Sequence, residues 1–205
     1  MLPISDRIIN NSRTKVSPRP AIFLDRDGTI IELRDYLRSL AEIVLFPRAA
    51  EGLKLLADAG YLLIIITNQS GVARGYFDEN FVRAANAKLN EMLARRGVVI
   101  DAVYYCPHHP QYGPEGYRVD CDCRKPKPGM ISKAAADFDI DLRRSWVIGD
   151  NEPDIKLAAN AGLRSVLVRT GYGGALAAQE HVCANIVAAD LYEAAERIIS
   201  GNGES

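Results

Sequence analysis

Short runs of apolar, largely β-branched residues alternate along this chain with longer stretches of helical periodicity. The apolar runs lie at residues 21–24, 62–66, 102–105, 146–148 and 165–168, and the clearest helical stretches at 49–59 and 79–95. A weaker strand at 186–188 and a terminal helix at 191–199 complete the pattern. Strands covered on both faces are nearly continuous in hydrophobicity, so the alternation predicts an α/β domain with a parallel sheet between helices.

Turn and cap residues agree with the predicted strands and helices. Gly60, Gly97 and Gly162 stand where helices should end, and Asp78 is a plausible N-cap for the second helix. Two stretches, 29–47 and 106–128, fit neither a strand nor a helix, and the second holds two His, three Cys and five Pro. Irregular loops of this length in a compact domain are usually functional or stabilised by metal.

Size and charge narrow the class of protein. With 205 residues the chain fits one domain, which we place at 21–200 after a flexible lead-in at 1–20. The lead-in lacks the apolar run of a signal peptide or membrane anchor, so we expect a cytoplasmic protein without a membrane partner. Lys+Arg 25 against Asp+Glu 26 gives a net charge of -1, which offers no footprint for nucleic acid. A small-molecule partner is the simpler expectation.

Polar groups follow the predicted strands, at 25–29, at 67–70, and at 149–150 with Asp154. The carboxyl ends of parallel strands meet at one crevice, so these groups can share a site. Each Asp alone could be a turn former or helix cap. Together, crowded carboxylates favour a cation, and a hard oxygen site with phosphate suits magnesium. Lys125 and Thr67 are suited to hold a transferring phosphoryl group, although Lys125 alone could be a solvated surface lysine.

Four strings in this order carry a clear resemblance: FLDRDGT at 23–29, TNQSG at 67–71, CRKPKPG at 123–129 and IGDNEPD at 148–154, with YYCPHHP at 104–110. They resemble the signature motifs of the haloacid dehalogenase (HAD) superfamily, and within it the heptose bisphosphate phosphatases, with the histidinol-phosphate phosphatases as near relatives. The resemblance covers about residues 21–171. It implies a Rossmann-like doubly wound parallel sheet of HAD type, with a minimal cap and a zinc loop at 106–125.

The resemblance also implies roles in catalysis. Asp25 would be the nucleophile on phosphorus, and Asp27 would protonate the leaving oxygen and then activate water against the aspartyl-phosphate. Thr67 and Lys125 would hold the phosphoryl group. Magnesium would bind the Asp25 carboxylate, the Asp27 backbone carbonyl and Asp150.

Substrate contacts follow from the same resemblance. Arg124 would contact the substrate, while Asn68, Gln69 and Ser70 would line the entrance, and Asp154 would support the metal site from behind. The expected activity is hydrolysis of the 7-phosphate of D-glycero-D-manno-heptose 1,7-bisphosphate in heptose precursor biosynthesis. A monomer is expected, because no large separate cap is inserted.

Two alternatives stay open at this point. Histidinol phosphate or another sugar phosphate is the first, although the loop at 107–120 is long, as in heptose enzymes. At Asn151, counted as a substrate contact, those enzymes commonly have Lys, so the identity of the sugar phosphate and the preferred anomer stay open. A non-catalytic zinc-binding module is the remote alternative, and the neutral charge and intact acidic motifs argue against it.

Three thiols and an imidazole fall within one loop: Cys106, His108, Cys121 and Cys123. The C-x-H and C-x-C spacing is compatible with a tetrahedral zinc site. The alternative without metal is buried cysteines with a capping histidine. His109 is the main rival ligand to His108. The family resemblance favours zinc, because this loop is a zinc loop in heptose bisphosphate phosphatases. Four protein ligands leave no open position, so such a zinc would be structural.

Overall fold

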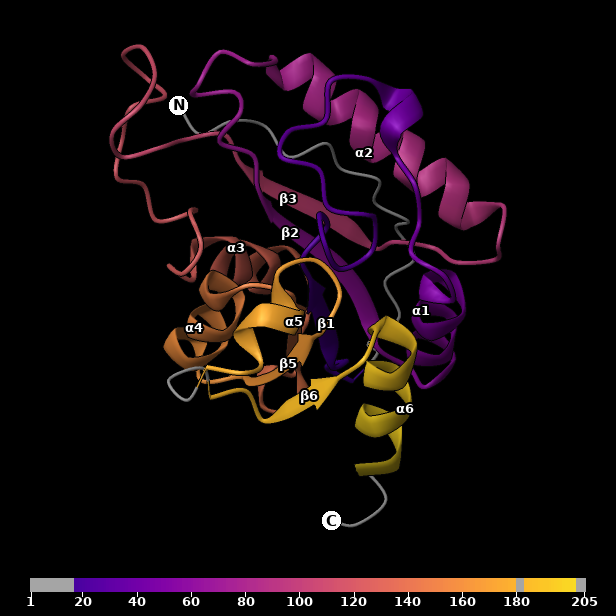
Figure 1. The fold of residues 1–205 in the computed structure, drawn as a ribbon. Coiled ribbons are helices and arrows are strands. Elements are labelled where there is room, and N and C mark those ends of the chain that lie inside the picture. Colours follow the sequence, from indigo (N-terminus) through magenta and orange to yellow (C-terminus); the bar gives the residue numbers. More distant parts are fainter. Residues whose placement is uncertain (1–16, 180–182, 202–205) are drawn as a thin grey trace.

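The computed structural model of the chain describes residues 17–179 and 183–201 and contains a six-stranded sheet. The strands are β1 (Ala21–Leu24), β2 (Leu62–Asn68), β3 (Ala102–Cys106), β4 (Trp146–Gly149), β5 (Arg164–Val168) and β6 (Ile186–Ala188). Their order is β3-β2-β1-β4-β5-β6, and every neighbouring pair is parallel. The predicted α/β doubly wound fold is therefore confirmed (Figure 1).

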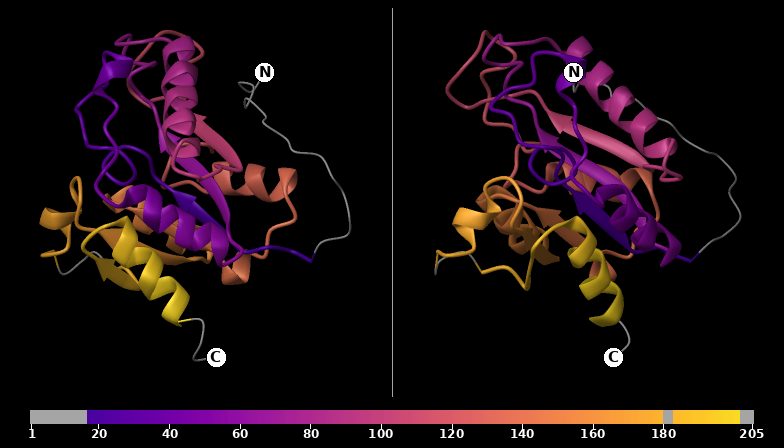
Figure 2. Two further views of the ribbon diagram at one scale, coloured as in Figure 1. Left: turned by 90° about the vertical axis from the view of Figure 1, so that its right-hand side faces the viewer. Right: turned by 45° about the vertical axis from the view of Figure 1, so that its right-hand side comes forward.

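Helices cover both faces of the sheet. One face carries α1 (Ala49–Asp58), α2 (Glu79–Ala94) and α6 (Leu191–Gly201), and the other carries α3 (Gly129–Asp137) and α4 (Glu152–Ala161). Figure 2 shows α1 and α6 side by side on their face. The short elements are α5 (Gly173–Leu176), beside β5, and the 3₁₀ turns η1 (Leu40–Glu42) and η2 (Leu142–Arg144).

The central strand β1 explains the uninterrupted apolar runs. Its side chains alternate between the two faces: Ile22 and Leu24 join the core under α1, α2 and α6, whereas Ala21 and Phe23 join the core under α3 and α4. All four are fully buried. A strand covered on both faces has no polar side, which is why the sequence predicted this strand with the bounds that the structure has.

The predicted helix signals act as expected. Asp78 caps α2 by accepting a hydrogen bond from the Phe81 N–H at 2.8 Å. Gly162 ends α4 in the left-handed conformation with φ 68°. Strand β2 continues to Asn68, two residues beyond the predicted run at 62–66, so polar residues that read as a loop extend the strand toward the site.

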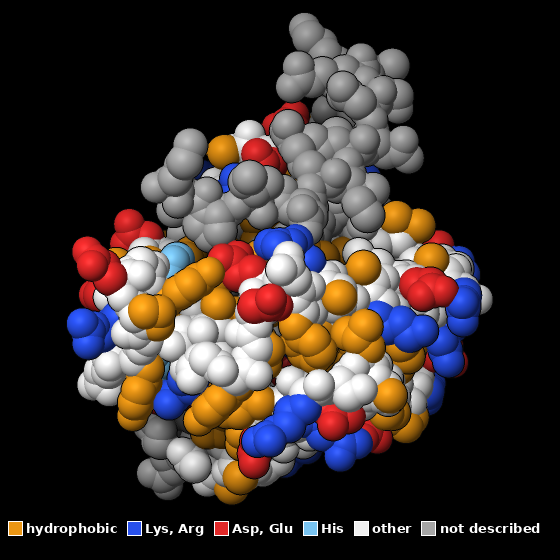
Figure 3. Space-filling model, turned by 90° about the horizontal axis from the view of Figure 1, so that it is seen from above, with side chains coloured by type: hydrophobic (Ala, Val, Ile, Leu, Met, Phe, Trp, Pro, Cys, Tyr) orange, Lys and Arg blue, Asp and Glu red, His pale blue; other side chains and the backbone are white. Residues whose placement is uncertain are grey.

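The N-terminal stretch is described only in part, because residues 1–16 of the predicted lead-in lie outside the described residues. In residues 17–20, Pro20 is buried and Arg19 forms an isolated parallel β-bridge with Ile140. The Arg19 Nε also donates to the Gly60 carbonyl at 3.1 Å. Across 17–179 and 183–201, the helices are too short or too polar to cross a membrane. On the face seen in Figure 3, basic and acidic side chains are interspersed among the described residues.

The strand order reverses between β1 and β4, which are neighbours although they are far apart in the chain. Ligands of open α/β sheets bind at such a point, beyond the carboxyl ends of the strands. The chain segments that start at Asp25 and at Asp150 leave the sheet here side by side. The fold thus brings the first and last acidic motifs together.

Candidate active site

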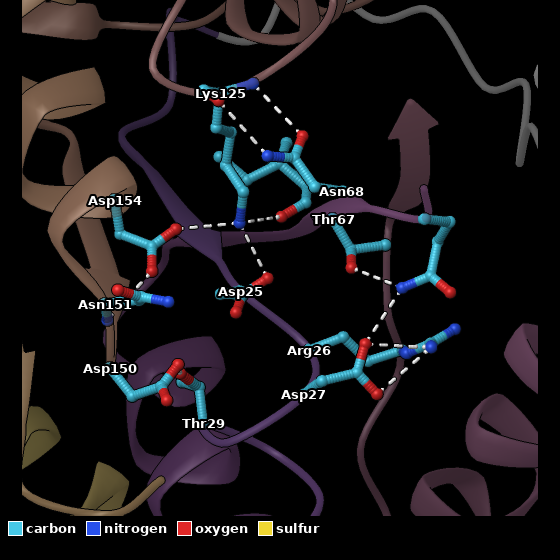
Figure 4. Close-up of polar contacts among 12 residues, drawn as sticks. Asp25, Arg26, Asp27, Thr29, Thr67, Asn68, Lys125, Asp150, Asn151 and Asp154 are labelled. Atoms are coloured by element: carbon cyan, nitrogen blue, oxygen red, sulfur yellow. Dashed lines mark hydrogen bonds and ion pairs between the residues drawn. The ribbon is translucent and has the colours of Figure 1, made fainter. Parts of the chain in front are cut away.

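Lys125 lies at the centre of the acidic cluster. Its Nζ is 2.6 Å from Asp25 Oδ1 and 2.7 Å from Asp154 Oδ1, and it also donates to the Ile66 carbonyl at 3.0 Å (Figure 4). The lysine side chain is only 3% exposed. A solvated surface lysine is thereby excluded.

Asp150 is held from several sides at the end of β4. The backbone N–H of Tyr172 donates to its Oδ2 at 2.9 Å, and the Thr29 hydroxyl lies 3.4 Å from its Oδ1. Gly28 and Gly171 both have positive φ, and a Cβ at either position would overlap the Asp150 carboxylate. Glycine is therefore required at both positions for the backbone to approach this carboxylate so closely.

The carboxylates of this cluster carry more negative charge than one lysine neutralises. Oxygen atoms of Asp25, Asp150 and Asp154 all lie within 4.8 Å of one another, and all three residues are buried. Burial raises the pKa of Asp150 to about 6. Burial also raises the pKa of Asp25 well above its ordinary value, although Lys125 opposes the shift.

The charge of Lys125 responds to the same surroundings. Burial alone lowers its pKa, but Asp154 and Asp25 outweigh burial and raise it above its ordinary value. Lys125 is therefore a fixed positive charge. Three buried carboxylates with one ammonium leave an excess of negative charge, and a hard divalent cation with oxygen ligands fits that donor set.

Asp27 lines the same crevice, but its carboxylate points toward Arg26 and away from Lys125 (Figure 4). Its Oδ2 is 2.9 Å from the Arg26 guanidinium and accepts a hydrogen bond from Gln69 Nε2 at 2.9 Å. Gln69 Nε2 also donates to the Thr67 hydroxyl at 2.9 Å, and Arg26 donates to Asn86 Oδ1 at 2.8 Å. Arg26 and Gln69 thus orient the carboxylate, a role of Arg26 that the sequence reading missed because it depends on the position of α2.

Asn68 and Arg124, two of the predicted substrate contacts, form hydrogen bonds to backbone groups of the protein. Asn68 bonds to the backbone of Lys125, and Arg124 donates to the carbonyl of His108 at 3.2 Å. Asn68 still lines the cavity, whereas Arg124 is not among its lining residues. The sequence offered no signal for these contacts, since they join segments that meet only in the folded chain.

The crevice opens into a cavity of about 310 Å³. Ser70 and Asn151, two of the predicted substrate contacts, line it, and the Asn151 side chain also caps α4 by accepting from the Glu152 N–H at 2.8 Å. Further walls come from residues that the sequence reading did not single out: Leu33, Arg34, Asp35, Tyr36, Leu37, Phe77 and Tyr172. Most of these belong to the loop at 29–47, which was predicted to be functional only as a whole.

The cysteine and histidine residues of the loop between β3 and α3 converge on one point. Cys106 Sγ lies 3.5 Å from Cys121 Sγ, which lies 3.1 Å from Cys123 Sγ, and His108 Nδ1 is 3.4 Å from Cys123 Sγ and 3.8 Å from Cys106 Sγ. Zn–S bonds of about 2.3 Å give tetrahedral S···S edges of about 3.8 Å, so these four ligands fit a zinc ion.

His109 is directed away from this cluster. Its Nε2 lies 3.3 Å from the Arg74 guanidinium, and its Nδ1 accepts from the Gln111 N–H at 3.1 Å. Burial lowers the pKa of His108, which favours the neutral imidazole that metal ligation needs. Of the two candidate histidines, His108 is the one that the fold brings to the thiols.

Comparison with known proteins agrees with this geometry. Residues 122–194 match the HAD-hydrolase-like family model. A D-glycero-β-D-manno-heptose-1,7-bisphosphate 7-phosphatase of Photorhabdus laumondii is 44% identical over 74% of this chain and 81% of that protein. A D-glycero-D-manno-heptose-1,7-bisphosphate 7-phosphatase of Chlorobaculum tepidum is 40% identical over 90% of this chain and 96% of that protein.

A solved structure extends the likeness to the fold. The D,D-heptose 1,7-bisphosphate phosphatase of B. bronchiseptica, complexed with magnesium and phosphate, is 35% identical with a TM-score of 0.79, covering 89% of this chain and 99% of that one. Sequence, fold and site therefore agree. The chain belongs to the heptose-1,7-bisphosphate 7-phosphatase family of the haloacid dehalogenase superfamily and is a phosphatase.

Proposed function

We propose that this phosphatase hydrolyses the 7-phosphate of D-glycero-D-manno-heptose 1,7-bisphosphate, with Asp25 as the nucleophile and with magnesium. The observation that carries the reaction is the buried Lys125 ammonium between Asp25 and Asp154, with Asp150 within reach of both carboxylates. The substrate rests on relatives of 40% and 44% identity that are named for this activity.

In the first step an Asp25 carboxylate oxygen attacks phosphorus and forms a covalent aspartyl-phosphate. The bond between phosphorus and the sugar oxygen breaks, and Asp27 gives that oxygen a proton. In the second step Asp27 takes a proton from water, whose oxygen attacks phosphorus and releases inorganic phosphate from Asp25. Thr67 and Lys125 donate to the phosphoryl oxygens, where negative charge accumulates.

The acidic cluster supports the place of magnesium in this mechanism. Asp25 and Asp150, with the backbone carbonyl of Asp27, would hold the ion, and Asp154 would stay with Lys125 behind it. When bound, the ion neutralises the crowded carboxylates and the phosphate oxygens. A phosphate that carries two negative charges can then approach a nucleophile that is itself negative.

The thiol cluster has a separate role in the proposal. Zinc bound by Cys106, His108, Cys121 and Cys123 would have no open position, so it stabilises the loop and takes no part in the reaction. Lys125 comes two residues after Cys123. Fixing the cysteine thus fixes the segment that delivers the lysine to the crevice.

Phosphorus NMR of the reaction mixture tests the substrate. With either anomer of the bisphosphate, the primary 7-phosphate signal should disappear first, while the anomeric phosphate signal stays intact. Loss of the anomeric signal first would contradict the proposed orientation. No release from either bisphosphate, together with fast release from histidinol phosphate, would move the substrate to the histidinol class while leaving the aspartyl-phosphate chemistry in place.

A further inference from the structure

Three of the described residues that line the cavity are positively charged: Arg26, Arg34 and Lys125. Arg26 and Lys125 are buried, with side chains 3% exposed, and each is held between protein groups. The side chain of Arg34 is 48% exposed. Among these three cations, therefore, only Arg34 is accessible from the solvent side of the cavity.

The charged side chains that line the cavity are mostly acidic. Five carboxylates line it, those of Asp25, Asp27, Asp35, Asp150 and Asp154. Lys125 and a bound magnesium can offset the charge around the phosphate that reacts. A second anionic group on the same molecule would still lack a positive partner, because the side chains of Asn68, Ser70 and Asn151, which also line the cavity, are neutral.

Arg34 can exchange its present partner for a phosphate at little cost. Its guanidinium pairs with Glu32 Oε2 at 2.9 Å, and the glutamate side chain is itself 42% exposed. Exposed pairs of this kind contribute little to stability. A guanidinium can instead donate two parallel hydrogen bonds to a phosphate, which is a stronger and more directional contact.

We propose that Arg34 binds the phosphate that is not hydrolysed and thereby selects bisphosphorylated sugars over monophosphorylated ones. This inference rests on the proposed function. Two cations of the cavity lining then match the two phosphates of the substrate: the buried Lys125 the reacting phosphate, and the exposed Arg34 the outer one. Because the outer contact is made equally in the ground state and in the transition state, it acts on KM and leaves kcat unchanged.

The test compares Arg34→Gln and Arg34→Lys with wild type on heptose 1,7-bisphosphate and on heptose 7-phosphate, which lacks the outer phosphate. Arg34→Gln should raise KM for the bisphosphate by about tenfold or more, with KM for the monophosphate and both kcat values within about twofold. Arg34→Lys should fall between Arg34→Gln and wild type. Arg38→Gln is the matched control, because Arg38 is an exposed arginine of the same loop outside the cavity lining.

The outcomes test the role of Arg34 and the proposed function separately. If wild type hydrolyses the bisphosphate but Arg34→Gln behaves like Arg38→Gln, the role of Arg34 is overturned and the proposed function stands. The same holds if Arg34→Gln raises KM equally for both substrates. If wild type hydrolyses only the monophosphate, the proposed substrate fails, and the inference about Arg34 fails with it.

Discussion

The amide of Asn68 holds the backbone of Lys125 from both sides: its Oδ1 accepts from the Lys125 N–H at 3.1 Å, and its Nδ2 donates to the Lys125 carbonyl at 3.2 Å. Asn68 is the last residue of β2, so the pair fastens the loop that carries Lys125 to the carboxyl end of this strand. The position of the Lys125 ammonium beside Asp25 therefore depends on a side chain that does not touch either charged group.

From this contact we expect Asn68→Ala to lower kcat by about 10- to 100-fold, because a displaced lysine stabilises the transition state less well. Loss of two hydrogen bonds should also lower the free energy of unfolding by about 1–3 kcal/mol. Steady-state kinetics and chemical denaturation measure the two effects. Ser70→Ala is the control for a neighbouring cavity residue and should leave kcat within about twofold. A change in KM alone for Asn68→Ala would instead support the substrate contact that the sequence suggested.

Asp25→Asn removes the proposed nucleophile with little change of shape. Turnover should fall by more than about 10⁴-fold, because an amide cannot form the aspartyl-phosphate. Without magnesium the variant should unfold no more easily than wild type, since burial already disfavours the Asp25 carboxylate and raises its pKa. Phosphate release and thermal unfolding are the measurements, with Asp35→Asn as a control on an exposed carboxylate of the same cavity. Near wild-type turnover, with deamidation excluded by mass spectrometry, would refute the covalent mechanism.

The parts of the fold that the sequence predicts well are those decided by local burial and by local caps. The run at β1 is apolar because both faces of the strand are covered, and Asp78 caps α2 through a residue three positions away. The contacts of Arg124 do not follow from local sequence. Its motif suggested a substrate contact, which stays a prediction, and gave no sign that its guanidinium donates to the His108 carbonyl, a contact set by tertiary structure. The cavity walls, such as Tyr36, depend in the same way on how a long loop folds back.

The raised pKa of Asp150 should make the stability of the magnesium-free protein depend on pH. Its pKa in the fold is raised from 3.8 to about 6, so between these values the unfolded chain has lost a proton that the folded chain retains. The free energy of unfolding therefore falls as the pH rises through this window, by up to about 3 kcal/mol for this group. In a buffer without magnesium, Asp150→Asn should be more stable than wild type above pH 6, and the difference should shrink toward pH 4.

Magnesium should reverse that order, because the ion stabilises the ionised carboxylate in the folded state. Denaturation curves of both proteins at several pH values, with and without magnesium, measure the effect. Wild type should gain stability from magnesium at pH 7.5, and Asp150→Asn should gain much less. An equal gain in the two proteins would show that the ion does not bind at Asp150.

The cysteine cluster leads to a prediction about metal content. Purified protein should hold about one zinc per chain, and Cys121→Ser should lose most of it, because a serine hydroxyl is a poor substitute for a thiolate ligand. Elemental analysis of protein prepared without chelators measures this. Cys183→Ser is the matched control, since Cys183 is an exposed free cysteine outside the cluster. No zinc in wild type, or equal zinc in the two variants, would overturn the assignment.

Cys121→Ser also tests how zinc affects catalysis, because the segment that follows Cys123 carries Lys125. Without zinc the loop at 106–125 loses its shared anchor, and we expect Cys121→Ser to unfold at a temperature lower by about 5 °C or more. Lys125 still has Asn68 on its backbone and Asp25 and Asp154 at its ammonium, so it should remain partly in place. We therefore expect kcat of the folded variant to fall by about tenfold rather than to vanish, in contrast to Asp25→Asn. Complete loss of turnover in a Cys121→Ser protein that is still folded by circular dichroism would mean that the metal does more than support the loop.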